Sequence, residues 1–166
     1  MSASNEGSTA AKSRTVVEAR SDRELVVTRT FDAPVHIVFK AWSTPDLFAS
    51  WWVPKSVGMS LESCEMDIRT GGTYRLVFRH PDFEQPMAFF GTYKEVTPNK
   101  RIAWSNEESP DGALTTVTFE EHGGKTQITL HELYPTTAAR DEAIAGSAEG
   151  LPEQFEQLDT LLETLD

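Results

Sequence analysis

Apolar and polar residues alternate along most of the chain, and this alternation predicts β-strands. The stretch ELVVTRTF (residues 24–31) is rich in β-branched residues and has the period of two that a half-buried strand requires. RTVVEA, just before it, is a candidate for one extra strand. Six further strands are predicted at Met59–Asp67, Thr73–His80, Met87–Val96, Arg101–Asn106, Leu114–His122 and Lys125–Leu133. Their separators are short turn sequences such as TGG, SPDG and HGGK, so we expect hairpins in an antiparallel sheet.

Two short segments between the first strand and the later ones have the period of a helix instead. In PVHIVFKAW (residues 34–42) apolar residues recur every three or four positions, and Asp32 is placed to cap the first turn. PDLFASWW (residues 45–52) follows a cap at position 43 or 44, and Pro54 ends it. These segments predict two consecutive helices.

The last part of the chain, Thr137–Leu165, has the composition of a helix. We expect Gly146 and the Gly150–Pro152 step to divide it. After Pro152, one face is apolar and the opposite face is acidic. The apolar stripe consists of Phe155, Leu158, Leu161, Leu162 and Leu165.

This order of elements indicates an α+β fold, because a run of strands is bracketed by helices. The apolar stripe of the C-terminal helix is suited to cover one face of the sheet. A single helix cannot fill the concavity of a strongly curved seven-stranded sheet. The sequence therefore predicts a cavity between helix and sheet.

Composition adds limits on where and with what the protein works. The chain has 166 residues, of which 39% are hydrophobic, and we expect one domain over residues 14–166 after a disordered polar stretch at 1–13. No signal peptide or membrane-spanning run is recognisable. A single cysteine fits a reducing cytoplasm. The net charge of −11 repels phosphate backbones and anionic lipids, so neither nucleic-acid binding nor membrane insertion is expected.

Four blocks of sequence resemble successive segments of one family: RTFDAPVHIVFKAWSTPDLFASWWVP, EMDIRTGGTYRLVF, GTYKEVTPNKRIAWS and TTVTFEEHGGKTQITL. It is the activator of heat-shock protein 90 ATPase homologue family (AHSA-type) of the START-like, polyketide-cyclase-like (SRPBCC) superfamily. The resemblance runs from about Glu24 to the C-terminus. It implies a helix-grip fold, in which a curved antiparallel sheet of six to seven strands wraps around a long C-terminal helix.

The resemblance also bears on function. Members of the superfamily bind lipids, sterols, hormones or polyketides in the cavity, some catalyse cyclisation there, and the family name implies a role in the stress response. Two departures matter here. Phe155 stands where many relatives have a tryptophan, and residues 1–23 do not resemble the separate domain with which the eukaryotic co-chaperone stimulates the chaperone's ATPase.

Residues able to carry catalysis or bind metal are sparse. The four histidines, at 36, 80, 122 and 131, are scattered and lack ligand spacing, and no nucleophile motif is present. Cys64 is expected to be a small, partly buried residue rather than a catalytic thiol. Thr70-Gly71-Gly72 is interpreted as a tight turn with glycine at positive φ, because no helix follows it as a phosphate loop would require. No metal, cofactor or catalytic residue is predicted.

Charges within the strands leave two possibilities open. Asp67 could pair with Arg69 or Arg75 across a hairpin and set its register, or an arginine could meet a ligand's carboxylate or phenolate. Glu95 lies two residues after Tyr93 and is therefore expected on the same strand face. It could hydrogen-bond a ligand hydroxyl or act as a general base.

Aromatic residues on the inward strand faces are the main candidates for a ligand pocket. Plain core packing is the alternative for most of them. Gly91 among bulky neighbours leaves room for a ligand or for close helix packing. The candidate ligand-binding residues are Trp51, Trp52, Tyr74, Leu76, Phe78, Phe89, Gly91, Tyr93, Glu95, Trp104, Phe119, Phe155 and Leu158.

Three of the chain's four tryptophans lie between Trp42 and Trp52. Trp42 continues the apolar stripe of the first helix and is expected in the core. Trp51 and Trp52 are 100° apart on a helix and cannot share one environment. One should anchor the two-helix corner to the sheet, and the other should reach the pocket mouth.

These features favour a domain that binds an apolar or aromatic small molecule non-covalently in the cavity. The alternatives are a co-chaperone or protein-interaction module, with a chaperone as partner, and a cyclase-like enzyme acting on an aromatic polyketide. A monomer or homodimer is expected.

Overall fold

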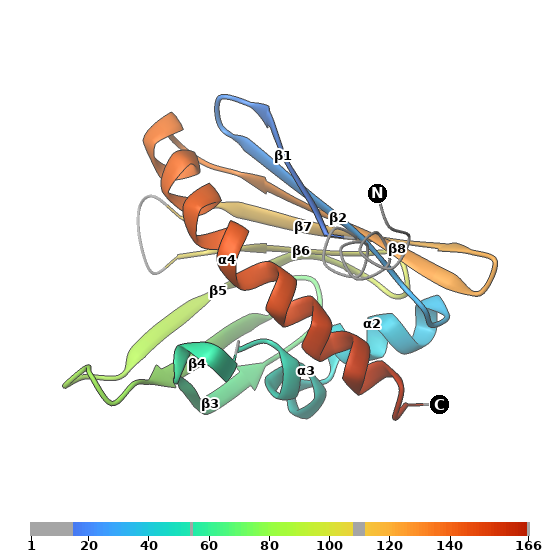
Figure 1. Cartoon of the computed structure of the whole chain (residues 1–166), viewed down its shortest axis with the longest axis horizontal. Coiled ribbons are helices and arrows are strands. Elements are labelled where there is room, and N and C mark those ends of the chain that lie inside the picture. Colours follow the sequence, from blue (N-terminus) through green and yellow to red (C-terminus); the bar gives the residue numbers. More distant parts are fainter. Residues whose placement is uncertain (1–14, 54, 108–111, 166) are drawn as a thin grey trace, which may run out of the picture.

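The computed structural model describes residues 15–53, 55–107 and 112–165, except for the side chains at 57 and 144–151. The described residues form an α+β structure with one eight-stranded antiparallel sheet in the order β1-β2-β8-β7-β6-β5-β4-β3 (Figure 1). The predicted disordered stretch 1–13 lies outside these residues. The strands are β1 (Val16–Ser21), β2 (Glu24–Phe31), β3 (Ser60–Met66), β4 (Thr73–Arg79), β5 (Met87–Thr97), β6 (Arg101–Ser105), β7 (Leu114–His122) and β8 (Lys125–Leu133).

The alternation in the sequence located the strands well. The bounds of β2, β7 and β8 are those predicted. The predicted bounds of β4, β5 and β6 are off by one residue at one end, those of β3 by one residue at each end, and those of β1 by two residues at each end. The candidate extra strand exists as β1, which forms a hairpin with β2 and raises the described strand count to eight. Gly71 has φ of 89°, which confirms its role in the turn between β3 and β4.

The helices cover the concave face of the sheet. They are α2 (Val35–Ser43), α3 (Pro45–Trp51), a 3₁₀ turn at Lys55–Val57 and α4 (Thr137–Leu162). Figure 1 shows α4 running across the sheet, with α2 and α3 near its C-terminal end. This arrangement is the helix-grip fold that the resemblance implied. None of the described helices is long and apolar enough to cross a bilayer.

The predicted division of the C-terminal helix is wrong. α4 continues without a break through Gly146, Gly150 and Pro152. A proline inside a helix removes one hydrogen bond and costs about 3 kcal/mol. Tertiary packing offsets this cost, because Phe155 and Leu158, directly after the proline, are fully buried against the sheet.

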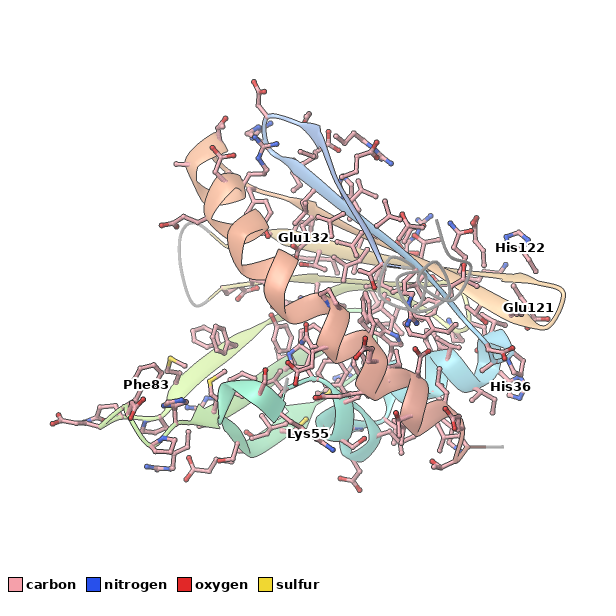
Figure 2. All side chains as sticks on the ribbon, in the orientation of Figure 1. His36, Lys55, Phe83, Glu121, His122 and Glu132 are labelled. Atoms are coloured by element: carbon pink, nitrogen blue, oxygen red, sulfur yellow. The ribbon has the colours of Figure 1, made fainter. Side chains whose placement is uncertain are left out.

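The N-terminal caps of the short helices also differ from expectation. Asp32 does not cap α2, whose first residue follows Pro34 at the cap position. The Val35 N–H instead donates to Glu121 Oε1 at 2.8 Å, so the end of β7 supplies the missing acceptor. Figure 2 shows Glu121 beside the start of α2. Thr44 is at the cap position of α3, as predicted, but its side chain makes no capping bond.

A partly buried ion pair connects α4 to the sheet. Arg29 on β2 is only 2% exposed and bonds both carboxylate oxygens of Asp159 on α4, at 3.0 and 2.5 Å. Its guanidinium also lies 4.6 Å from the centre of the Phe31 ring. Two parallel bonds to a carboxylate hold orientation as well as distance, so this pair sets how α4 crosses β2.

Candidate functional site: an aromatic pocket between the sheet and the helices

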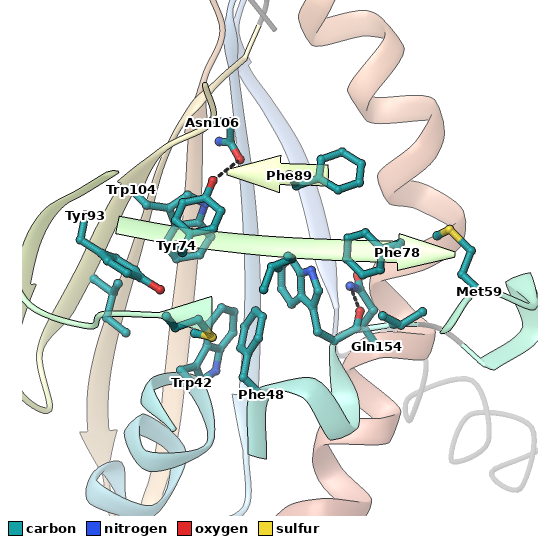
Figure 3. Close-up of a pocket in the computed structure, with 15 residues that line it drawn as sticks. Trp42, Phe48, Met59, Tyr74, Phe78, Phe89, Tyr93, Trp104, Asn106 and Gln154 are labelled. Carbon is teal, nitrogen blue, oxygen red and sulfur yellow. Dashed lines mark hydrogen bonds between the residues drawn. The ribbon is translucent and has the colours of Figure 1, made fainter. Parts of the chain in front are cut away.

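A cavity of about 280 Å³ lies between the inner face of β3–β6, the α2–α3 corner and α4 (Figure 3). None of the described residues that line it is charged at neutral pH. The lining consists of Trp42, Phe48, Trp52, Val53, Met59, Met66, Tyr74, Leu76, Phe78, Phe89, Tyr93, Ile102, Trp104, Asn106 and Gln154. An apolar wall with few polar atoms is typical of a small-molecule site.

The strand register gathers the aromatic residues of the sheet wall. Residues directly opposite on paired strands share a face. Leu76 on β4 lies opposite Phe89 on β5, and Tyr93 on β5 lies opposite Trp104 on β6. The Tyr74 and Tyr93 rings are 5.6 Å apart between centres. Alternation within each strand then repeats the apolar side chain every second residue along the wall.

The α2–α3 corner forms the opposite wall, and it separates the two adjacent tryptophans. Trp51 is fully buried and donates its Nε1–H to the Ala41 carbonyl at 3.0 Å, which anchors α3 to α2. Trp52 lines the cavity and stacks on Phe48 with 4.7 Å between ring centres. Trp42 is both core and lining, since it is 2% exposed and contacts the cavity.

Side chains of α4 hold the segment after α3 in place beside the cavity. Gln154 Nε2 donates to the Trp52 carbonyl, and Gln157 Nε2 donates to the carbonyls of Trp51 and Val53, both at 2.9 Å. Figure 3 shows Gln154 at the edge of the pocket. The helix therefore closes this side of the cavity through amide hydrogen bonds rather than by apolar filling.

The polar end of the cavity is a chain of hydrogen bonds. The Tyr74 hydroxyl lies 2.8 Å from the Ser105 carbonyl oxygen and 3.2 Å from Asn106 Oδ1. Asn106 Nδ2 donates to the Ala113 carbonyl at 2.7 Å and to Thr115 Oγ1 at 3.1 Å. Because a carbonyl only accepts, the Ala113 bond identifies which end of the amide is nitrogen. The amide oxygen of Asn106 therefore faces Tyr74.

The chain continues beyond the cavity to a carboxyl group on the inner face of β8. Thr115 Oγ1 donates to Glu132 Oε2 at 3.2 Å, and the Tyr134 hydroxyl donates to Glu132 Oε1 at 2.7 Å. Burial raises the pKa of Glu132, although these two bonds act in the opposite direction. Burial likewise raises the pKa of Tyr134, helped by the neighbouring carboxylate.

Tyr93 differs from Tyr74 in its hydroxyl. Tyr93 is 4% exposed, and its hydroxyl has no hydrogen-bond partner among the described residues. Figure 3 shows this hydroxyl pointing into the pocket, away from the Tyr74–Asn106 pair. Burial raises its pKa, followed by smaller effects of Cys64 and Asp67, so the phenol is neutral at physiological pH.

Seven of the thirteen predicted ligand-binding residues line the cavity: Trp52, Tyr74, Leu76, Phe78, Phe89, Tyr93 and Trp104. Four others, namely Trp51, Phe119, Phe155 and Leu158, are buried in the core away from it. Gly91 does not leave room for a ligand. A Cβ there would lie 1.8 Å from the Ser105 carbonyl oxygen, so the glycine permits close approach of the β6 backbone.

The prediction that Glu95 shares the face of Tyr93 is wrong. The register between β5 and β6 shifts between these residues, so that Tyr93 pairs with Trp104 while Glu95 pairs with Ala103. Such a bulge moves the following side chain to the other face. The Glu95 carboxylate accepts from Thr97 Oγ1 at 2.8 Å and lies 3.6 Å from Arg101, outside the pocket.

The expected ion pair near the Gly-Gly turn is local and exposed. Arg69 Nε bonds Asp67 at 2.9 Å, but the two residues are on the same loop, and both are largely exposed. Arg75 is exposed on the outer face. The pair therefore does not span the hairpin, and neither arginine lines the described pocket.

The sequence interpretation missed eight lining residues: Trp42, Phe48, Val53, Met59, Met66, Ile102, Asn106 and Gln154. Alternation could have identified Ile102, because it shares a strand face with Trp104, and helical spacing could have identified some of the other apolar residues. Asn106 and Gln154 carried none, because each enters the site through a long-range contact.

Metal ligands and reactive groups do not gather at the site. Among the residues the structure describes, no cluster of three histidine, cysteine or acidic residues could hold a metal ion. His36 and His122 lie at the far end of the molecule near α2 (Figure 2). Burial raises the pKa of the Cys64 thiol, which favours its unreactive protonated form.

Comparisons with known proteins agree with this architecture. The family model for "Activator of Hsp90 ATPase homolog 1-like protein" matches residues 32–163. A protein from Rhodobacter sphaeroides is similar in structure, with a TM-score of 0.83, 24% identity, and coverage of 92% of this chain and 99% of that one. A protein from Nitrosomonas europaea has a TM-score of 0.79 and 23% identity, and the match covers 89% of this chain and 98% of that one.

A further solved structure carries the family's own description. An AHSA1-like protein from Aeromonas hydrophila has a TM-score of 0.61 and 20% identity, covering 79% of this chain and 92% of that one. At these identities the solved structures establish the fold alone. No curated protein matches the chain.

Proposed function

The chain belongs to the family of activator of Hsp90 ATPase homolog 1-like proteins, and we propose that it binds a small apolar or aromatic molecule in the pocket between the sheet and α4. The observation that carries this proposal is the cavity of about 280 Å³ with its aromatic, uncharged described lining. Aromatic walls bind planar ligands through burial and ring contacts. The single cysteine of the chain supports a cytoplasmic location for this role.

The lining supports binding rather than catalysis. It contains no carboxylate, imidazole or thiol among its described residues, and its buried tyrosine is held neutral. General acid–base chemistry would need a group that titrates near the working pH. The cyclase alternative therefore receives no support from the described groups.

The experiment that tests the proposal is native mass spectrometry of the protein purified from its own host, with identification of any co-purified molecule. A neutral dye, N-phenyl-1-naphthylamine, provides an independent titration by fluorescence. Met59→Trp, which fills the pocket edge, should abolish saturable dye binding. Leu114→Trp, at an exposed residue outside the pocket, should leave it unchanged. An apoprotein that binds no dye would contradict the proposal.

A protein-interaction role is a second candidate, carried by a different observation. Phe83 and Phe90 on and beside the β4–β5 hairpin are 48% and 41% exposed. Figure 2 shows Phe83 at the far tip of the molecule. Exposed aromatic side chains of this kind often mark binding surfaces. A change in the ATPase rate of a purified Hsp90-type chaperone that depends on these two residues would support this role.

A further inference from the structure

We propose that the pocket selects neutral aromatic molecules carrying a carbonyl or similar hydrogen-bond acceptor, and that the Tyr93 hydroxyl donates to this acceptor. This inference rests on the proposed function, since it specifies what the same pocket binds. It concerns two properties of the described lining residues: none of them is charged, and the Tyr93 hydroxyl has no hydrogen-bond partner among them.

The uncharged lining determines that the ligand is neutral. The described side chains around the cavity supply no cation to pair with a carboxylate or phosphate, and no anion to pair with an amine. Moving an unpaired charge from water into such an environment is strongly unfavourable. The acidic chain as a whole, at −11, adds repulsion against anions. The uncharged lining therefore disfavours ligands of either charge, and the net charge adds to the exclusion of anions alone.

The unpartnered hydroxyl determines that the ligand carries an acceptor. Tyr93 is 4% exposed overall, and its hydroxyl opens into the cavity without an acceptor among the described residues. A ligand that fills the cavity removes this hydroxyl from solvent, and leaving it unpaired there is costly unless the ligand accepts its proton. A ligand carbonyl offers lone pairs and no proton, which suits a phenol that must donate.

Tyr74 supplies an internal comparison in the same wall. Its ring centre is 5.6 Å from that of Tyr93, but its hydroxyl already contacts the Ser105 carbonyl and Asn106 Oδ1. One hydroxyl has one proton to donate. The Tyr74 proton is therefore already used, and Tyr93 is the tyrosine able to recognise an acceptor.

The test uses two probes of the same shape. 2-Acetylnaphthalene carries a carbonyl oxygen, and 2-isopropenylnaphthalene has a methylene group in its place. Equilibrium dialysis should show that the wild-type protein binds the ketone about tenfold more tightly than the alkene, as expected for one buried hydrogen bond. 2-Naphthoate, a carboxylate on the same rings, should bind at least about tenfold more weakly than the ketone.

Two hydroxyl deletions identify the donor. Tyr93→Phe should reduce the ketone-to-alkene ratio to about one while keeping alkene affinity. Tyr74→Phe is the matched control and should keep the ratio near ten, because its hydroxyl does not serve the ligand. Circular dichroism and urea unfolding of each variant confirm that it is folded. If either variant fails to fold, the Tyr93 hydroxyl can be followed in the wild type by ¹³Cζ-tyrosine NMR, whose Tyr93 signal should shift with the ketone and not with the alkene.

The outcomes separate this inference from the proposed function. Equal binding of ketone and alkene by the wild type overturns the inference and leaves ligand binding intact. A ratio that survives Tyr93→Phe but is lost in Tyr74→Phe overturns the assignment to Tyr93. Tight binding of 2-naphthoate overturns the selection for neutral ligands. Binding of none of the three probes contradicts the proposed function itself.

Discussion

The two halves of the concave sheet face are built from the same kinds of residue, yet one is solid and the other is hollow. Over β2, α4 packs directly on the sheet, with Phe155 and Phe31 ring centres 5.5 Å apart, and α2 packs on β7, with Phe39 and Phe119 ring centres 5.3 Å apart. Over β3–β6, α4 contributes the polar Gln154 and leaves a cavity of about 280 Å³. Composition alone therefore does not make a pocket. The position of the helix over the sheet does.

Substituting one phenylalanine in each half tests this contrast most strongly. Phe155→Ala should lower the free energy of unfolding by about 4 kcal/mol, because it opens a void in a filled core. Phe78→Ala, in the pocket wall, should cost about 2 kcal/mol, because its ring already borders empty space. Urea denaturation measures both. Equal losses would mean that the cavity is filled or collapsed in solution.

The adjacent tryptophans offer the same contrast within one helix turn. Trp51→Ala removes a fully buried ring and its bond to Ala41, so stability should fall by about 3–5 kcal/mol. Trp52→Ala should mainly weaken binding of a neutral aromatic probe. Parallel unfolding and dye titrations distinguish the two effects. If both variants lose only stability, the pair is purely structural.

The Arg29–Asp159 pair joins α4 to β2 in the filled half. Asp159→Ala should cost about 3 kcal/mol, because it leaves the Arg29 guanidinium buried without its partner. The double variant Arg29→Met with Asp159→Leu should recover most of this loss. Thermal and urea unfolding would measure the recovery. If the double variant does not regain stability, the pair contributes more to stability than pairing one charge with the other.

Glu132 is connected to the pocket residue Asn106 through Thr115. Substituting Glu132 should change the free energy of unfolding less than the substitutions above. Its pKa is raised by burial, so the folded state binds its proton more tightly than the unfolded state does. Its contribution to stability is therefore greatest at low pH and falls as pH rises from about 4 towards neutral. Glu132→Gln should lack this pH dependence. Unfolding free energies of both proteins between pH 4 and 7 measure the difference, and parallel curves would contradict it.

Much of the fold could be predicted because its signals are local. The strand bounds of β2, β7 and β8 follow from alternation, and the two short helices follow from apolar spacing and proline positions. The same local signals misjudged α4. Pro152 and two glycines predicted a break, but the buried side chains after the proline stabilise a continuous helix.

About half of the residues that line the candidate site could be predicted from the sequence. Alternation places Tyr74, Phe78 and Phe89 on the inner face, and these do line the cavity. It placed Glu95 there too, but one bulge reverses the face of every residue that follows until the next irregularity. A bulge has no strong sequence signature, so a strictly periodic interpretation fails beyond it.

The sequence by itself determined which side chains face inward on regular strands, that the chain folds as a helix-grip, and that aromatic residues dominate its interior. Only the tertiary structure decided which of these residues surround empty space. It assigned Trp51 to the core and Trp52 to the pocket. It left the Tyr93 hydroxyl without a hydrogen-bond partner among the described residues, whereas the Tyr74 hydroxyl contacts the Ser105 carbonyl and Asn106. These outcomes depend on the crossing of α4, the β5 bulge and backbone carbonyls from distant segments. Contacts between distant segments leave no period in the sequence, whereas the burial of one face of a strand or helix does.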